Sequence, residues 1–235
     1  MTKGIQVICN DFIYFNFLEK WAKQLDAMGI SSNEKGCDNT ISVDSVIALN
    51  EHTTKHEVDI FLGEIIFFNN HDYEPSGFIL TEDPKSSLEN LLAYFKNNSE
   101  AIVDPVGGLM FFEGDKKIIP GCCCSVEDGI EAIEDISNKK STWLGHDPFP
   151  RVEYKEGYIT VWDDDCLGEY VDKPISKEQL ISIDFSETEL SIFLPQAKKD
   201  VELFFLKPFK QRITEFNADI ADELTNAIIK WLGIK

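Results

Sequence analysis

Hydrophobic residues recur along the chain at two different spacings, which predict helices and strands in alternation. Apolar positions three and four residues apart indicate helices over 11–28, 84–95, 125–136 and 217–233. Short apolar runs bounded by turn residues indicate strands over 5–9, 40–49, 58–68, 77–80, 109–112, 116–119, 151–154, 158–162 and 181–185. Between 187 and 205 the pattern fits either type, and Pro195 argues against one uninterrupted helix unless that helix is kinked.

The order of these elements favours an α+β fold. Two pairs of predicted strands are joined by short glycine-containing turns, at Gly114-Asp115 and at Glu156-Gly157, which is typical of hairpins. Hairpins interspersed with helices predict a mixed or largely antiparallel sheet with packed helices, rather than a repeated parallel βαβ arrangement. We expect a single unit over 1–235, and the alternative is a division into 1–100 and 101–235.

The charge of the chain narrows the classes of partner. Its 235 residues include 22 basic and 42 acidic side chains, which give a net charge of −20. Such a surface repels phosphate backbones and anionic lipid headgroups, so we expect neither nucleic acid nor membrane as a partner, whereas a basic protein partner would be attracted. The longest apolar run is five residues, and the N-terminus lacks a secretory pattern, so we expect a cytoplasmic location.

Three of the six cysteines are consecutive, in the segment Pro120-Gly121-Cys122-Cys123-Cys124-Ser125. Adjacent cysteines rarely satisfy disulfide geometry with each other, and reduced thiols agree with a cytoplasmic location. A helix that begins after Ser125 would favour thiolates through its dipole, whereas carboxylates in its first turns act against them. Buried packing, metal ligation and a reactive thiol therefore all stay open for Cys122, Cys123 and Cys124.

A second candidate site lies in the segment from Gly145 to Pro150. His146 and Asp147 precede Pro148, and two prolines on alternate residues stiffen this predicted loop. A stiff loop suits a functional site, although the same residues could bond to the backbone of a buried loop. If it is a site, His146 would be a general base or a ligand and Asp147 its orienting group or a second ligand. A cysteine would then be the nucleophile or a soft ligand.

The third candidate is the acidic run Asp163-Asp164-Asp165, which follows a predicted strand. Asp163 and Asp165 occupy the first and third places of a calcium-loop template, but Leu167 and Pro174 break that template later. A looser cation site at Asp163 and Asp165 and a solvated acidic turn are the two remaining interpretations. No complete zinc, nucleotide or hydrolase motif occurs, so we predict no specific cofactor, and zinc or another divalent cation is what these clusters could hold.

The cysteine run, the segment Gly145-His146-Asp147-Pro148-Phe149-Pro150 and the C-terminal helix that ends in Trp231-Leu232-Gly233 resemble a family of uncharacterised bacterial proteins. The resemblance spans roughly residues 105–235. It implies a bacterial intracellular protein. That family has no assigned activity, so the resemblance transfers no catalytic residue.

Two functional hypotheses follow from the sequence. The first is a non-catalytic acidic binding protein, such as an immunity-type inhibitor that covers a basic partner, because the charge is strongly negative and no catalytic motif is complete. The second is a metal- or thiol-dependent enzyme that uses the cysteine run and the His146–Asp147 loop. The second hypothesis requires these two segments to meet at one end of a sheet, since ligation and proton transfer act only over short distances.

Overall fold

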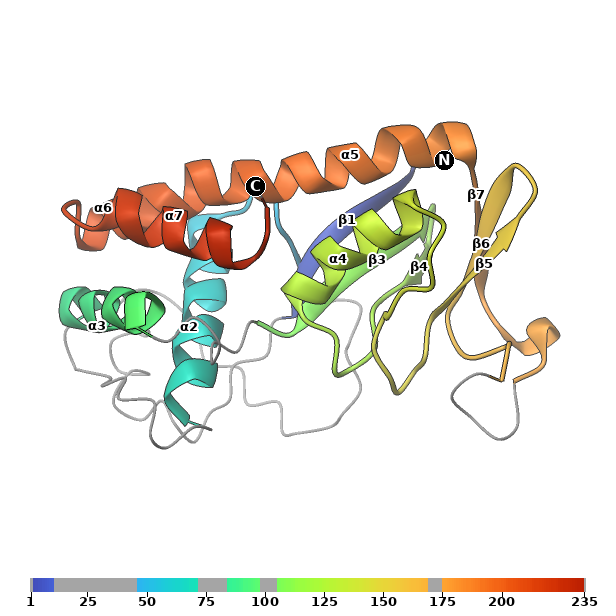
Figure 1. Cartoon of the computed structure of the whole chain (residues 1–235), viewed down its shortest axis with the longest axis horizontal. Coiled ribbons are helices and arrows are strands. Elements are labelled where there is room, and N and C mark those ends of the chain that lie inside the picture. The colour runs from blue at the N-terminus through green and yellow to red at the C-terminus, as the bar shows by residue number, and fades with distance from the viewer. Residues whose placement is uncertain (1, 11–45, 72–83, 98–104, 169–174, 235) are drawn as a thin grey trace. The chain divides into compact units, whose positions relative to one another are not determined.

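The computed structural model describes residues 2–10, 46–71, 84–97, 105–168 and 175–234. The strands in these ranges form two antiparallel sheets, with helices beside them, which confirms the predicted α+β fold (Figure 1). Contacts between residues divide the chain into two compact units. The described parts of the first unit are 2–10, 46–49, 106–168 and 175–201, and those of the second are 50–71, 84–97, 105 and 202–234. Each unit is therefore assembled from separate stretches of the chain.

The larger sheet of the first unit has four strands in the order β2-β1-β3-β4. Their bounds are β1 Lys3–Asn10, β2 Val46–Ala48, β3 Gly107–Glu113 and β4 Lys116–Ile118. Helix α4 (Val126–Ser137) packs on β3 and β1 (Figure 1). The packing is close because Gly129 of the helix lies against Gly108 of β3, where an added Cβ would come within 2.7 Å of backbone atoms.

The smaller sheet has the order β5-β6-β7, with β5 Arg151–Lys155, β6 Tyr158–Trp162 and β7 Ser182–Ser186. A short 3₁₀ helix, η3 (Lys177–Gln179), precedes β7. Phe111 of β3 contacts Phe185 of β7 with ring centroids 5.9 Å apart, and both rings are fully buried. The two sheets of this unit therefore share one aromatic core.

The second unit is helical in its described residues. It contains α2 (Lys55–His71), α3 (Pro84–Asn97), the π-helical turn η4 (Phe205–Phe209), α6 (Lys210–Phe216) and α7 (Ala221–Trp231). Its centre is a cluster of four fully buried rings, in which Phe61 contacts Phe204, Phe205 and Phe209 at centroid distances of 5.0–5.9 Å. None of the described helices is both long and apolar enough to cross a lipid bilayer.

Several predicted elements differ from the structure. The segment 58–68 belongs to helix α2 and is not a strand, because a Thr54–Glu57 capping interaction begins a helix there. Helix α5 (Glu187–Phe204) continues through Pro195. Proline has no N–H to donate, so the carbonyl of Ser191, four residues earlier, lacks its usual helical donor, and Ser191 is exposed. The last helix begins at Ala221, later than the expected cap at Asn217.

The hairpins at 109–119 and 151–162, helix α3 and helix α4 are confirmed close to their predicted positions. The predicted helix 11–28 and strand 77–80 lie outside the described residues, as does most of the predicted strand 40–49.

Candidate functional site

Two loops of the first unit meet through their backbones. The N–H of Gly121 donates to the carbonyl of Leu144 at 2.7 Å, and the N–H of Cys122 donates to the carbonyl of His146 at 2.7 Å. Gly121 is in such close contact that an added Cβ would lie 2.4 Å from the backbone nitrogen of His146. Gly145 adopts a positive φ of 92°, and a Cβ there would lie 2.7 Å from Gly121. The glycines thus allow the cysteine run and the histidine loop to touch.

This contact brings two thiols and an imidazole together. The Sγ atoms of Cys122 and Cys123 are 3.7 Å apart, and the Sγ of Cys122 is 3.3 Å from Nδ1 of His146. Within the described ranges these three residues form the one group whose potential ligand atoms all lie within 4.8 Å of one another. Cys123 is exposed and the other two are partly buried, so the group opens to solvent on one side.

The third cysteine of the run has a different environment. Cys124 is 1% exposed, and its Sγ lies so close to β3 that a Cβ added to Gly108 would be 2.8 Å from it. The backbone of Cys124 accepts a hydrogen bond from Gly107, which ties the run to the sheet. Ser125 then begins α4 with a capping box to Asp128. The structure therefore separates Cys124, which packs in the core, from Cys122 and Cys123.

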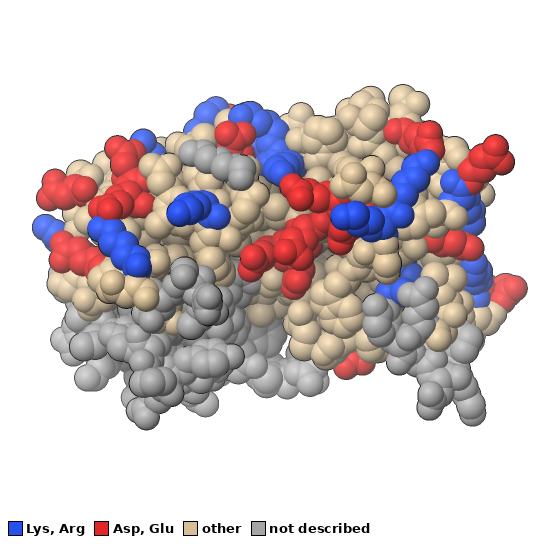
Figure 2. Space-filling model, viewed as in Figure 1, with Lys and Arg blue, Asp and Glu red and all other residues tan. Residues whose placement is uncertain are grey.

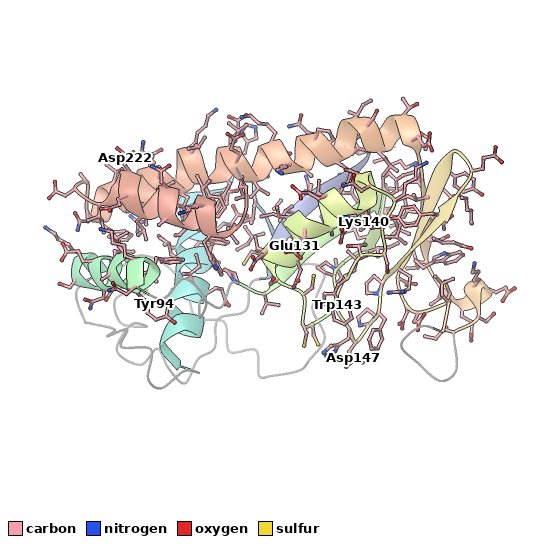
Figure 3. The ribbon with its side chains drawn as sticks, in the orientation of Figure 1. Tyr94, Glu131, Lys140, Trp143, Asp147 and Asp222 are labelled. Atoms are coloured by element: carbon pink, nitrogen blue, oxygen red, sulfur yellow. The ribbon has the colours of Figure 1, made fainter. Side chains whose placement is uncertain are left out.

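Asp147 and two aromatic rings surround the imidazole. Oδ2 of Asp147 lies 3.1 Å from Nδ1 of His146, and the Asp147 side chain is 77% exposed. The rings of Trp143 and Phe149 lie 6.3 Å and 5.9 Å from the imidazole, measured between centroids. Trp143 and Asp147 project from the same loop between α4 and β5 (Figure 3). The rings shield two sides of the imidazole, and the carboxylate lies on its solvent side.

The electrostatic environment of Cys122 opposes negative charge. Burial, its hydrogen bond with Cys123, the charge of Cys123 and the charge of Asp147 together raise the pKa of Cys122 to about 11. A thiol with this pKa is protonated at neutral pH and is a poor nucleophile.

The acidic run lies in turns that stabilise the neighbouring loops. Asp163 accepts a hydrogen bond from the N–H of Ile181, and the fully buried Asp165 accepts two, from Leu167 and Gly168. Asp164 accepts the N–H of Phe149 at 3.0 Å and so supports the histidine loop. The structure therefore does not place Asp163 and Asp165 in the group formed by Cys122, Cys123 and His146.

The sequence analysis named Cys122, Cys123 and His146, which the structure brings together, but it missed the residues that make this contact. Gly121 and Gly145 make the contact between the loops, and Asp164 supports it. A glycine directly before each chemically active segment was a usable signal, because close backbone approach requires a residue without a Cβ.

Comparisons with protein-family models, curated proteins and solved structures find no match to this chain. The resemblance to a bacterial family therefore stays a prediction.

Proposed function

We propose that the protein binds a soft divalent cation, zinc in the first place, through Cys122, Cys123 and His146. The carrying observation is the convergence of two thiols and an imidazole nitrogen from separate loops. Thiolate and imidazole are the ligands that zinc prefers in proteins, and three protein ligands with one open position are typical of zinc sites that act on a bound molecule. This supports the hypothesis of a metal-dependent enzyme that uses the cysteine run and the His146–Asp147 loop.

The observed separations agree with tetrahedral coordination. Zinc–sulfur bonds of about 2.3 Å and zinc–nitrogen bonds of about 2.0 Å place two sulfurs about 3.8 Å apart and a sulfur and a nitrogen about 3.5 Å apart. The corresponding distances are 3.7 Å between the two Sγ atoms and 3.3 Å between Sγ of Cys122 and Nδ1 of His146. Two of the three ligand pairs thus need to move by only a few tenths of an ångström.

Asp147 lies outside this group but close to it. Its carboxylate contacts the same Nδ1 atom and is exposed, so it can accept a hydrogen bond from a water on the open side of the ion. The fourth position then belongs to water or to a substrate atom. Such a water is more acidic than bulk water, and Asp147 would be the group that accepts its proton.

Cobalt(II) substitution tests the proposal, because cobalt replaces zinc and reports thiolate ligation by absorption. We expect one equivalent to bind, with a thiolate-to-metal charge-transfer band that weakens in Cys122→Ser and in Cys123→Ser. His146→Ala should lower zinc affinity at least about 10-fold, as the loss of a ligand or its support does. Cys166→Ser is the matched control, because Cys166 is also a partly buried thiol but lies outside the group.

The proposal is wrong if the purified chain binds neither ion in competition with a weak chelator. It is also wrong if Cys166→Ser reduces binding as much as Cys122→Ser does. Asp147→Asn should lower affinity less than His146→Ala does, because it removes a partner of the bound water and not a ligand.

A second candidate is capture of a basic protein through helix α4, which carries Glu127, Asp128 and Glu131 at its N-terminal half. Burial and the two neighbouring carboxylates raise the pKa of Glu127, and Figure 2 shows acidic side chains gathered over α4. A surface of one charge attracts an oppositely charged partner. Binding of an oligolysine peptide at low salt should weaken in Glu127→Gln and Glu131→Gln but not in Glu156→Gln. Equal effects of all three would argue against a specific surface on α4.

A further inference from the structure

The acidic run Asp163-Asp164-Asp165 lies outside the group of two thiols and an imidazole, but it is bonded to the histidine loop. Oδ1 of Asp164 accepts the N–H of Phe149 at 3.0 Å, and Phe149 follows His146 by three positions. Hydrogen bonds that a carboxylate accepts from a backbone N–H are among the stronger ones in proteins. The acidic run therefore holds the loop that carries the imidazole.

This hydrogen bond uses the single N–H that the end of the histidine loop has. Prolines occupy both neighbouring positions, Pro148 and Pro150, and proline has no N–H to donate. The ladder of strand β5 begins only at Arg151. Over 148–150 the backbone N–H of Phe149 is thus the one donor of the main chain, and Asp164 accepts it.

Asp147 lies between two attached parts of the loop and has an uncommon backbone conformation. Its φ is 52°, in the left-handed region that residues with a Cβ seldom adopt. Such a conformation persists only where the surrounding structure fixes it. Before Asp147, the carbonyl of His146 accepts the N–H of Cys122. After it, Asp164 holds Phe149. Release of either attachment would let the loop relax, and the imidazole would move with it.

The ring of Phe149 gives a second connection from Asp164 to the imidazole. Its centroid lies 5.9 Å from that of His146 and 6.5 Å from that of Trp143, so the three rings pack as one cluster. Asp164 fixes the backbone from which the Phe149 ring projects. A movement of Phe149 would therefore remove part of the packing that orients His146.

The acidic run is itself held firmly. Asp165 is fully buried, and its carboxylate accepts the N–H groups of Leu167 and Gly168 at 3.0 Å and 2.8 Å. Oδ1 of Asp164 also accepts the N–H of Asp165 at 2.7 Å. A carboxylate on such a turn has a fixed position, which a group that orients a neighbouring loop requires.

We propose that Asp164 is a positioning residue, which holds the histidine loop so that Nδ1 of His146 lies beside Sγ of Cys122. Asp164 is not itself a ligand and acts through Phe149. The inference rests on the proposed function in one respect, because it assigns part of the zinc affinity to Asp164. The acidic run, which the sequence suggested as a cation site of its own, thus becomes a support for the neighbouring one.

Zinc competition with a chromophoric chelator tests the effect on affinity. Asp164→Ala should lower zinc affinity about 10-fold, the lower end of what the loss of a partner outside the ligand set does. Asp164→Asn should recover most of this loss, because an amide oxygen can accept the same two hydrogen bonds. Asp164→Glu keeps the carboxylate but displaces it, so its affinity should lie between the two.

Asp163→Ala is the matched control. Asp163 belongs to the same run, but its carboxylate accepts the N–H of Ile181, next to β7, and is not bonded to the histidine loop. Both alanine variants remove one carboxylate, so a general electrostatic effect would appear in both. We expect Asp163→Ala to bind zinc as the unsubstituted chain does.

Labelling of Cys122 by iodoacetamide, resolved by tandem mass spectrometry, tests the positioning without any metal. In a Cys123→Ser background, Asp164→Ala should speed this labelling, because the partly buried thiol loses its contact with His146. Asp163→Ala in the same background should react at the rate of its parent.

Equal labelling rates in these three proteins would overturn the proposal. A zinc affinity that falls as much in Asp163→Ala as in Asp164→Ala would overturn it as well. If the unsubstituted chain binds no zinc, the proposed function fails, and the labelling rates alone then decide whether Asp164 holds His146 beside Cys122.

Discussion

Substitution of Gly121 by alanine tests whether backbone contact between the two loops creates the proposed site. An added Cβ would lie 2.4 Å from the nitrogen of His146, 2.4 Å from the carbonyl oxygen of Pro148 and 2.5 Å from the carbonyl oxygen of His146. All three are backbone atoms, so no side chain can rotate out of the way. The loops must therefore separate by about 1 Å to restore ordinary van der Waals contact.

This separation has two consequences. Overpacking of a close contact costs about 1–3 kcal/mol. The two 2.7 Å hydrogen bonds from Gly121 and Cys122 would be weakened as well, at about 1 kcal/mol each. We expect the free energy of unfolding to fall by about 3–5 kcal/mol. A shift of this size also exceeds the roughly 0.2 Å tolerance of zinc–ligand distances, so zinc affinity should fall about 10- to 100-fold.

Urea unfolding and zinc competition with a chromophoric chelator measure the two effects. Gly63→Ala is the matched control, because Gly63 lies inside helix α2 and an added Cβ meets nothing within 4 Å. Alanine there should stabilise the chain by about 0.5–1 kcal/mol and leave zinc binding unchanged. A Gly121→Ala variant with the urea midpoint and zinc affinity of the unsubstituted chain would refute the loop-contact reasoning.

Two further predictions concern stability. Asp59→Ala should lower the free energy of unfolding by about 3 kcal/mol in a urea titration. The buried guanidinium of Arg212 is bonded to Asp59 through two nitrogens, and the substitution leaves it without its main counter-charge. An effect below about 1 kcal/mol would contradict a buried pair. Tyr154 has a pKa of about 12 in the folded chain against about 10 when unfolded, so it favours the folded state below pH 10 and loses that contribution as the pH rises to 12. Between these limits the unsubstituted chain should lose about 1 kcal/mol more stability than Tyr154→Phe, a value reduced for the half-exposed ring, and parallel pH profiles of the two proteins would exclude this role.

The sequence predicted local elements where their signals were short-range. The β5–β6 hairpin and the start of α4 at Ser125 depend on turn glycines and on a capping box within a few residues, so both were found. The error at 58–68 has a different origin. In helix α2, Val58, Ile60, Phe61, Leu62 and Ile65 are all buried, so their apolar pattern covers most of the helix surface and gives no clear period.

The residue types of this candidate group are visible in the sequence, whereas their meeting in space is not. The cysteine run and His146 are chemically conspicuous residue types, whereas their meeting depends on hydrogen bonds between residues about 24 positions apart, for which the sequence has no periodic signal. The same contact explains why three adjacent, chemically identical cysteines differ. The carbonyl of Cys124 accepts a hydrogen bond from Gly107 of β3, and its side chain is buried in the core. The N–H of Cys122 donates to the carbonyl of His146 in the histidine loop, and its Sγ lies beside the imidazole. A variant that keeps all three thiols but loses the Gly121 contact should therefore lose the metal. A Cys124→Ser variant should instead lose stability and keep the metal. A site defined by backbone position requires these two opposite outcomes.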